Sequence, residues 1–359
     1  MHYNYFIIIG FIISFFLFYK FPILPRNNKK LKYNISIVIP ARNEENNIDN
    51  LLCDLKNQDC LINEIICVDD NSTDKTSEII KNHNVKYIFI DDVKKGWRGK
   101  NWACQVGGQN ATGDLLIFID ADVRLDKDAI SSLVSAYDKN RNPISVQPYH
   151  IVKKQYEMFS FFFNLIQICS TSLSIFRAKK TVGFYGPVFL VQKDMFLKLG
   201  GYEGVKDKVV EDLHLGKLYK NNNIDIELFL GGDLIKFRMY PKGITQLIEG
   251  WSKNFSQASF AIDLKLFLMI FFWVGYLGSL PIEMGIALSL KSTSFLIGSF
   301  ILYIITVIKL NNDIKKIGSY PIYVSILFPF YLLIFFLIFV YSLFSTFLFR
   351  NTTWKGRKL

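Results

Sequence analysis

Cysteine is scarce in this sequence, and its spacing carries no site signature. The 359 residues include five cysteines, an odd number, and no two of them stand in a C-x-x-C arrangement. The four histidines are scattered and form no zinc pattern. These absences exclude a small disulfide scaffold, and we interpret the cysteines as reduced cytosolic thiols that pack as small apolar residues.

Two common phosphate-binding motifs are also missing. No G-x-x-x-x-G-K-[ST] sequence is present, which argues against ATP hydrolysis, and no G-x-G-x-x-G follows the first predicted strand, which argues against NAD or FAD. Charged residues make up only 20%, whereas 50% are hydrophobic and the mean hydropathy is +0.22. This composition excludes a disordered chain or a coiled coil and indicates a membrane protein with a folded soluble part.

The excess of positive charge, 42 − 31 = +11, is concentrated beside apolar segments. Lys20–Lys32 carries five basic residues and no acid, and Arg350–Leu359 carries four basic residues. Basic residues that flank apolar runs are typical of the cytoplasmic face of a membrane. Nucleic acid is therefore a poor explanation of the high isoelectric point, and we expect no nucleic-acid partner.

The first apolar run, Tyr3–Tyr19, is uncharged and is followed at once by Lys20. It lacks the preceding basic residues and the small residues at a cleavage site that a signal peptide needs. We expect residues 1–20 to be an uncleaved membrane anchor with the N-terminus outside and the soluble part in the cytoplasm. A buried core helix is the alternative, because seventeen residues is short for a span.

Apolar runs return near the C-terminus and predict transmembrane helices over residues 264–350. Leu266–Leu290 contains one charge, while Ser292–Ile308 and Ile317–Phe349 contain none. The last run is about 50 Å long as a helix, too long for one crossing and too short for two, so the number of crossings stays open. A break near Pro329, or an interfacial last segment, would keep the basic tail inside. The sequence thus predicts a multi-pass plasma-membrane protein.

Between residues 34 and 148, strand and helix patterns alternate. The predicted strands are Ile35–Pro40, Glu64–Asp69, Val85–Ile90, Leu115–Ile119 and Ile144–Pro148. The predicted helices are Glu45–Asn57, Thr73–Asn82, Asn101–Ala111 and Asp126–Lys139, with Ser72 as the N-cap of the second. Such repeats predict a doubly wound α/β domain, which we assign to residues 34–260. We expect the aromatic segment Tyr156–Phe176 to be an amphipathic helix on the membrane surface, with a transmembrane span as the alternative.

Acidic residues follow three of the predicted strands at one edge of the sheet, where open α/β sheets bind their ligands. They are Asp69, Asp70, Asp91, Asp92, Asp120 and Asp122. Carboxylates gathered together repel each other, and a divalent cation with oxygen ligands is the usual relief. Lys100 opens a helix at the same edge. The pattern favours a diphosphate site with Mg²⁺ or Mn²⁺.

These segments resemble the nucleotide-sugar-binding half of family 2 glycosyltransferases, which have the Rossmann-like GT-A fold. The matching motifs are Ser36–Glu45, Val68–Asp74, Gly99-Lys100 with Ala103, and Ile119–Val123. Gly186–Lys193 and Leu199–Tyr202 resemble the segment that the family places under the acceptor, and Glu211-Asp212 resembles its acidic catalytic motif. The order and spacing match across about Ile35–Gly250.

The resemblance implies roles for individual residues. Asp212 would be the general base with Glu211 beside it, Asp70 would hydrogen-bond the uracil, Asp120 would contact the ribose or diphosphate, and Asp122 would hold the metal. The implied substrate-binding set also includes Pro40, Arg42, Glu44, Lys100, Gly186 and Trp251. Plainer interpretations stay open for four residues. These are Asp69 as a turn residue, Glu44 as a helix cap, and Trp97 and His214 as packing residues.

A narrower resemblance concerns the substrates. Ser145–His150, Phe237–Tyr240, Glu249–Trp251 and Trp354–Arg357 resemble the membrane-bound 4,4'-diaponeurosporenoate glycosyltransferases of bacterial carotenoid synthesis. Those enzymes attach glucose from UDP-glucose to a carotenoid carboxylate, so the resemblance implies a UDP-sugar and a membrane lipid as partners.

We therefore predict an inverting, metal-dependent hexosyltransferase. One alternative is a transferase that acts on polyprenyl phosphate or a ceramide-like hydroxyl lipid. Another is a polysaccharide synthase or channel subunit. The Gln-x-x-Arg-Trp motif of processive synthases is not met, because Gly250 precedes Trp251. A conduit should also have polar residues along its membrane spans, where only Glu283 lies deep in an apolar run.

Overall fold

The computed structural model describes residues 3–27, 32–176, 183–208, 211–258 and 264–344, and two short strands, Thr353–Trp354 and Arg357–Lys358. The chain divides into two compact units. We call Pro22–His150 with Lys180–Arg238 the sheet unit. We call Met1–Phe21 with Ile151–Lys179 and Met239–Leu359 the helical unit.

A seven-stranded mixed sheet forms the centre of the sheet unit, in the order β3-β2-β1-β4-β8-β6-β9. The strands are β1 (Ile35–Ala41), β2 (Glu64–Asp70), β3 (Lys86–Ile90), β4 (Leu115–Ile119), β6 (Ile144–Gln147), β8 (Val188–Gln192) and β9 (Glu227–Leu230). The first four in this order are parallel, and β8 runs antiparallel to both of its neighbours. Every residue of β4 is buried, as expected for an apolar strand covered on both faces.

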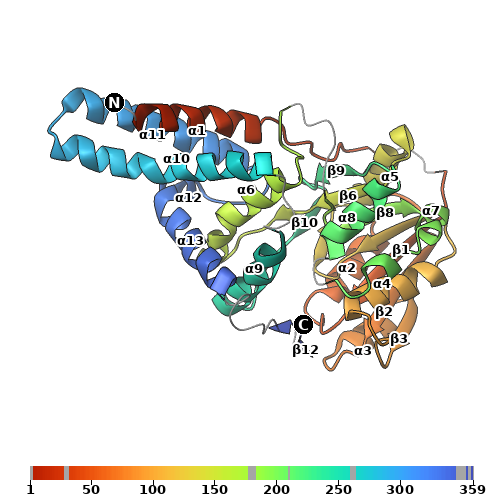
Figure 1. Ribbon diagram of the computed structural model, residues 1–359. Coiled ribbons are helices and arrows are strands. Elements are labelled where there is room, and N and C mark those ends of the chain that lie inside the picture. Colours follow the sequence, from red (N-terminus) through yellow and green to blue (C-terminus); the bar gives the residue numbers. More distant parts are fainter. Residues whose placement is uncertain are drawn as a thin grey trace. The chain divides into compact units, whose positions relative to one another are not determined.

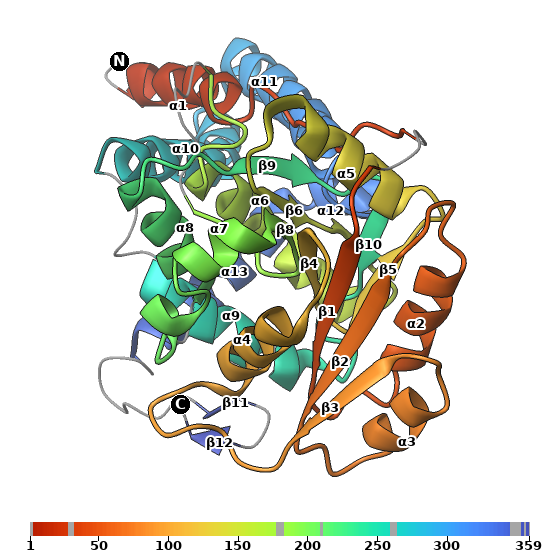
Figure 2. The ribbon, with the colours of Figure 1, turned by 90° about the vertical axis from the view of Figure 1, so that its right-hand side faces the viewer.

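Helices cover both faces of the parallel half, with α2 and α3 on one side of β1–β3 and α4 on the other (Figure 2). They are α2 (Ile48–Lys56), α3 (Thr76–Lys81), α4 (Gly99–Asn110) and α5 (Ala129–Asn140). Three further elements follow, α7 (Lys193–Lys198), η2 (Glu203–Val205) and α8 (Glu211–Asn221). The predicted alternation is confirmed, but Ser72 is not the N-cap of the second helix. That helix begins at Thr76, and the Ser72 hydroxyl instead accepts a hydrogen bond from the backbone amide of Asn43.

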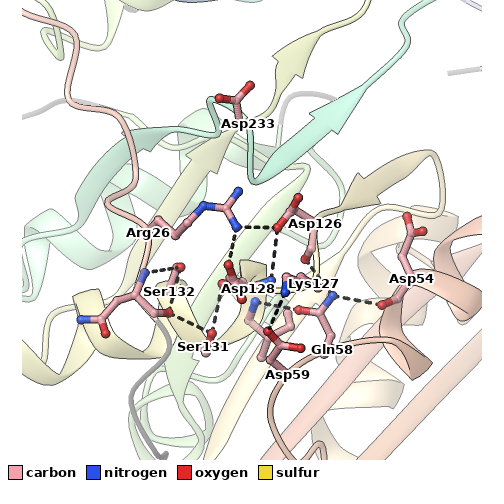
Figure 3. A network of polar contacts seen from close by, with 12 residues as sticks. Arg26, Asp54, Gln58, Asp59, Asp126, Lys127, Asp128, Ser131, Ser132 and Asp233 are labelled. Atoms are coloured by element: carbon pink, nitrogen blue, oxygen red, sulfur yellow. Dashed lines mark hydrogen bonds and ion pairs between the residues drawn. The ribbon is translucent and has the colours of Figure 1, made fainter.

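The segment before β1 is fastened to the sheet unit. The backbone amide of Leu24 donates to the carbonyl of Leu230, at 2.8 Å. Arg26 forms ion pairs with Asp126, at 2.7 Å, and with Asp128 (Figure 3). These acids lie between α5 and a second small sheet, which consists of β5 (Val123–Leu125), β10 (Ile235–Phe237) and β7 (Tyr149–His150). The Arg26 cation of the predicted basic cluster is therefore paired within the sheet unit.

The helical unit contains the long apolar helices. Its elements are α1 (Tyr3–Leu17), η1 (Gln155–Ser160), α6 (Phe161–Ser170), α9 (Ile244–Ala258), α10 (Leu264–Ser289), α11 (Thr293–Ile314), α12 (Ile322–Ile326) and α13 (Phe328–Phe344). Among the described helices, α10 and α11 are each long and apolar enough to cross a membrane. They form a hairpin, and α1 lies along α10 (Figure 1). Gly10 permits this approach, since a Cβ there would lie 2.3 Å from the Cβ of Tyr276.

The segment predicted as an amphipathic surface helix is instead part of the interior of the helical unit. It forms η1 and α6, and the side chains of Phe161, Phe162 and Phe163 are fully buried. The ring of Phe163 stacks on Trp251 with 4.7 Å between centroids, and the amide of Asn164 donates to the Tyr320 hydroxyl at 2.7 Å. The prediction is wrong because polar residues that suggested a solvent face, Glu157, Asn164 and Ser170, make hydrogen bonds within the helical unit.

The last apolar run is interrupted where the sequence suggested a break. A five-residue helix, α12, ends before Leu327, and α13 begins at Phe328. Pro329 then occupies the first turn of α13, where its missing N–H has no partner to lose. The side chains of Leu333 and Leu337 face outward from α13 and are more than half exposed. The helical unit therefore presents an apolar exterior on this helix as well.

Candidate active site

The loops that follow β1 and β2 are joined to each other by hydrogen bonds. The backbone amide of Asn43 donates to Ser72 Oγ at 3.0 Å, and Asn43 Oδ1 accepts from the amide of Thr73 at 2.9 Å. The amide of Glu44 donates to Thr76 Oγ1 at 2.7 Å. Asn43 has a φ of +53°, a left-handed conformation that asparagine tolerates better than most residues. The two loops thus form one fixed rim at the carboxyl ends of the strands.

Arg42 and Asp70 lie in this rim and contact each other. Arg42 Nη1 donates to the backbone carbonyl of Asp70 at 2.7 Å and lies 3.5 Å from its carboxylate. The Asp70 side chain is almost fully buried. Pro40, the half-buried next-to-last residue of β1, pairs in register with Val68 of β2. Arg42 follows directly after β1. The structure therefore brings three of the predicted substrate-binding residues to one place.

Asp69 supports the turn. One of its carboxylate oxygens accepts from the backbone amide of Ser72 at 3.0 Å, and the other accepts from the hydroxyls of Ser77 and Tyr87, the latter at 3.1 Å. Its side chain is fully buried. These bonds fit the plainer interpretation of Asp69 as a turn residue beside Asp70.

Lys100 connects Asp120, after β4, to the predicted catalytic acids at the start of α8. Its ammonium lies 2.9 Å from the carboxylate of Asp120 and 3.3 Å from that of Glu211. Lys100 is the second residue of α4, Asp120 follows β4, and Glu211 begins α8. Three separate segments of the chain therefore meet at one cation.

Burial and the neighbouring charges shift the pKa values of Asp120 and Lys100. Burial raises the pKa of Asp120, and the nearby carboxylates of Glu211 and Glu44 raise it further, against the opposing effect of Lys100. Burial alone would lower the pKa of Lys100, but Asp120, Glu211 and Asp212 outweigh it and raise the pKa well above its ordinary value. Lys100 is thus held as a cation among several acids.

A turn after β4 places the Asp120-Ala121-Asp122 sequence. The backbone amide of Asp120 donates to the carbonyl of Pro187 at 2.9 Å, and its carbonyl accepts from the amide of Val123 at 3.1 Å. Asp122 is half-buried within this turn, between β4 and β5. The bond to Pro187 also ties the end of β4 to the residue beside Gly186.

Gly186 lies directly against the predicted base. A Cβ at this position would lie 2.5 Å from Asp212 Oδ1 and 2.8 Å from its carboxyl carbon, closer than real Cβ contacts occur. Only glycine leaves room for the Asp212 carboxylate where it stands. The sequence motif around Gly186 and the acidic motif of α8 therefore form a single site.

Trp251 belongs to the helical unit, and its described contacts are internal to that unit. Its side chain is buried, its indole N–H donates to Ser160 Oγ at 3.0 Å, and its ring stacks on Phe163. Its assignment to the substrate stays a prediction.

The other residues with two interpretations have identifiable contacts. Glu44 accepts a hydrogen bond from the side-chain amide of Asn47 at 2.8 Å, which favours a local cap, although its charge also acts on Asp120. Trp97 is buried and packs edge-on against Trp102. Partial burial, together with the charge of Lys208, lowers the pKa of His214.

One other group of possible metal ligands occurs in the described part of the chain. The ligand atoms of Asp49, Cys53 and His83 lie within 4.8 Å of one another. His83 Nε2 is 2.9 Å from Asp49 Oδ1, and a plain imidazole–carboxylate hydrogen bond accounts for this pair. The buried Nδ1 of His83 lacks the hydrogen-bond acceptor that would orient the ring toward a metal.

Comparison with known proteins defines the class. The model of glycosyl transferase family 2 matches residues 36–200. The chain belongs to this family and is a glycosyltransferase. Within the family, it is 30% identical over 343 residues to 4,4'-diaponeurosporenoate glycosyltransferase of Staphylococcus aureus (strain USA300), which covers 92% of this chain and 90% of that protein. The enzyme of strain MRSA252 is 30% identical over 340 residues, with the same shares.

A solved structure shows the same fold. The mannosyltransferase PcManGT from Pyrobaculum calidifontis, solved in complex with GDP-Man and Mn²⁺, superposes with a TM-score of 0.53 at 15% identity. The match covers 94% of this chain and 99% of that one. The predicted GT-A class, with its Rossmann-like sheet, is confirmed.

Proposed function

We propose that this glycosyltransferase moves a sugar, glucose, from a UDP-sugar to a membrane lipid, with a carotenoid carboxylate as the acceptor. The observation that carries the proposal is the bridge from Asp120 through Lys100 to Glu211, at 2.9 and 3.3 Å. Because Asp120 follows β4, this bridge supports assigning the neighbouring Glu211-Asp212 pair to catalysis next to the proposed UDP-sugar site. The names of the relatives, which are 30% identical over 92% of the chain, support the carotenoid acceptor.

The donor end of the site is the rim formed by the loops after β1 and β2. Its fixed geometry suits a flat base held against Asp70, while Arg42 fixes the backbone of Asp70 at 2.7 Å. A diphosphate would then extend toward Asp120 and the first turn of α4, where Lys100 offers a cation and the backbone amides of a helix N-terminus favour negative charge.

The acidic residues near Lys100 have the chemistry of ligands for a divalent cation. Among the described contacts, Lys100 is shared by Asp120 and Glu211, and Asp212 and Glu44 add further negative charge near it. Carboxylate oxygens such as these are the ligands that Mg²⁺ and Mn²⁺ prefer. Asp122 would hold the ion, with Asp120 close by in the same turn. When bound, the ion would supply positive charge that offsets that of the diphosphate.

The transfer itself is a single displacement with inversion. An acceptor oxygen forms the new bond to the anomeric carbon while the bond from that carbon to the UDP oxygen breaks. Lys100 offsets the negative charge that develops on the departing UDP. A hydroxyl acceptor gives its proton to Asp212, whereas a carboxylate, already ionised at neutral pH, has none to give.

The membrane is the source of the acceptor in this proposal. The apolar helices α10 and α11 would span the plasma membrane, and the sheet unit would lie in the cytoplasm, where UDP-sugars are made. A lipid-borne carboxylate at the membrane surface could then reach the site without leaving the bilayer.

The test uses the purified full-length protein in lipid nanodiscs with Mn²⁺. It is offered UDP-glucose with 4,4'-diaponeurosporenoate, with the corresponding carotenoid alcohol or with polyprenyl phosphate, and products are identified by mass spectrometry. We expect a glucosyl ester of the acid. Transfer only to the alcohol or to the phosphate would support the hydroxyl-lipid or polyprenyl-phosphate alternative, and transfer only from another nucleotide sugar would refute the donor assignment.

A further inference from the structure

Helix α4 holds the loop that leads to the catalytic motif. The backbone carbonyls of Val205, Lys206 and Lys208 converge on one side-chain amide, that of Asn101. The distances from Asn101 Nδ2 are 2.8, 3.4 and 3.3 Å, respectively. Since all three partners are acceptors, the group that faces them must be the NH₂, and its two hydrogens are both used.

Arg98 adds two bonds to the same loop. Its backbone amide donates to the carbonyl of Lys206 at 2.7 Å, and its Nε donates to the carbonyl of Asp207 at 3.3 Å. The loop therefore receives its bonds from the first turn of α4 and the residue that precedes it, next to Lys100.

Packing does not hold this loop. Val205 is buried, but the side chains of the following Lys206, Asp207 and Lys208 are 44%, 62% and 40% exposed. Burial of apolar surface therefore contributes little after Val205. The path of residues 206–208 is fixed by hydrogen bonds, some within the loop's own turns, from Lys206 to Glu203 and from Lys208 to Val205, and others from Asn101 and Arg98 at the start of α4. Glu211 follows three residues after Lys208.

We infer that Asn101 is a positioning residue that sets the place of Glu211-Asp212 relative to Lys100 and the donor acids. The inference rests on the proposed function for the roles of those groups. Asn101 itself is 1% exposed, and its amide is directed at the loop. Lys208, the last residue that Asn101 holds, is three residues from Glu211 in the chain, so we expect a change at Asn101 to shift Glu211-Asp212 while Asp120 and Asp70, on other loops, stay in place.

The test compares Asn101→Leu, which keeps the size but removes both donors, with the milder Asn101→Ser and with the wild type. Asn110→Leu is the matched control, because it makes the same change on α4 at an exposed residue whose amide bonds only within the helix, to the carbonyl of Val106. We expect kcat to fall roughly 10- to 100-fold in Asn101→Leu and less in Asn101→Ser, since misplacement by about 1 Å can cost about 100-fold. The KM for the UDP-sugar and the Kd for UDP should stay within a factor of about three of the wild-type values.

Amide hydrogen exchange supplies a readout that needs no substrate. Residues 205–208 and the start of α8 should lose protection in Asn101→Leu while β1 and the rest of α4 keep theirs. Unchanged kcat or unchanged protection would overturn the inference. Loss of UDP affinity in step with kcat, or unfolding of both variants, would assign Asn101 to general stability and also overturn it. If the wild type neither binds UDP nor transfers sugar, the proposed function fails, and the exchange result still decides whether Asn101 holds residues 205–208 in place.

Discussion

Gly186→Ala offers a sharp test of the catalytic assignment, because it adds one carbon directly against the predicted base. The new Cβ would lie 2.5 Å from Asp212 Oδ1, whereas an ordinary contact is at least 3.4 Å. The carboxylate must therefore move by 3.4 − 2.5 = 0.9 Å. Gly186 is not among the glycines with a positive φ, so alanine adds no backbone strain, and the effect falls on Asp212.

A shift of the Asp212 carboxylate by about 1 Å should lower the rate of sugar transfer. Misplacing a catalytic group by about 1 Å costs on the order of 100-fold, or about 2.7 kcal/mol of transition-state stabilisation. The loss of activity in Gly186→Ala should depend on the type of acceptor. With an alcohol we expect about 100-fold in kcat, because the base must remove a proton, whereas with a carboxylate the loss should be small and nearly independent of pH. On each acceptor it should approach the loss caused by Asp212→Asn.

The assay is steady-state transfer from UDP-glucose, with UDP affinity measured separately by calorimetry. Gly204→Ala is the matched control, since a Cβ there meets only the Leu218 methyls, at 3.5 Å or more. A double-mutant cycle then asks whether the change acts through the base: in the Asp212→Asn background, Gly186→Ala should cost little more. Equal losses in both backgrounds, or a weakened UDP affinity, would refute the reasoning.

Three further expectations concern the metal, the membrane and pH. Asp122→Asn, like removal of the metal with EDTA, should remove several kcal/mol of transition-state stabilisation and so lower turnover strongly. Retained activity would reject the metal assignment. Deletion of Met1–Lys20 should leave the protein in the membrane fraction, because α10 and α11 remain; a soluble, active truncation would contradict this. The hydrogen bond from Arg26 lowers the pKa of Asp126 below its usual 3.8, so this pairing stabilises the fold above pH 3.8 and is lost as the pH falls through the folded-state value. The difference in unfolding temperature between wild type and Arg26→Met should thus shrink below about pH 3.8, and a constant difference would argue against the ion pair.

The meeting of acidic and basic residues at one edge of the sheet could be predicted because it follows directly from where strands end. In a parallel sheet all strands deliver their following residues to one edge, so the strand pattern alone places Asp70, Asp120 and Lys100 together. The contact between Lys100 and Asp120, at 2.9 Å, confirms this for two of the three residues. Helix starts were less predictable, since Ser72 looked like a cap but bonds to the neighbouring loop instead.

The segment of α6 shows a different limit. Its alternation of aromatic and polar residues has the same appearance whether the polar side chains meet water, lipid headgroups or buried partners. Asn164 donates to Tyr320, more than 150 positions away in the sequence, and no local pattern signals such a partner. That pairing and the stacking of Phe163 on Trp251 accompany the burial of most of this helix.

The same reasoning explains why Asn101 escaped sequence analysis while Asp212 did not. Catalytic groups need particular side chains, so they leave a motif. The partners of Asn101 are backbone carbonyls, which nearly every residue offers, so the sequence of the held loop leaves no trace of the contact. Helix α4 carries both kinds of residue within its first turn: Lys100, which the motif reveals, and Asn101, which only the path of the neighbouring loop reveals. Positioning of Glu211-Asp212 therefore depends on an interaction that a motif search passes over, and it is sensitive to a substitution that leaves every motif residue intact.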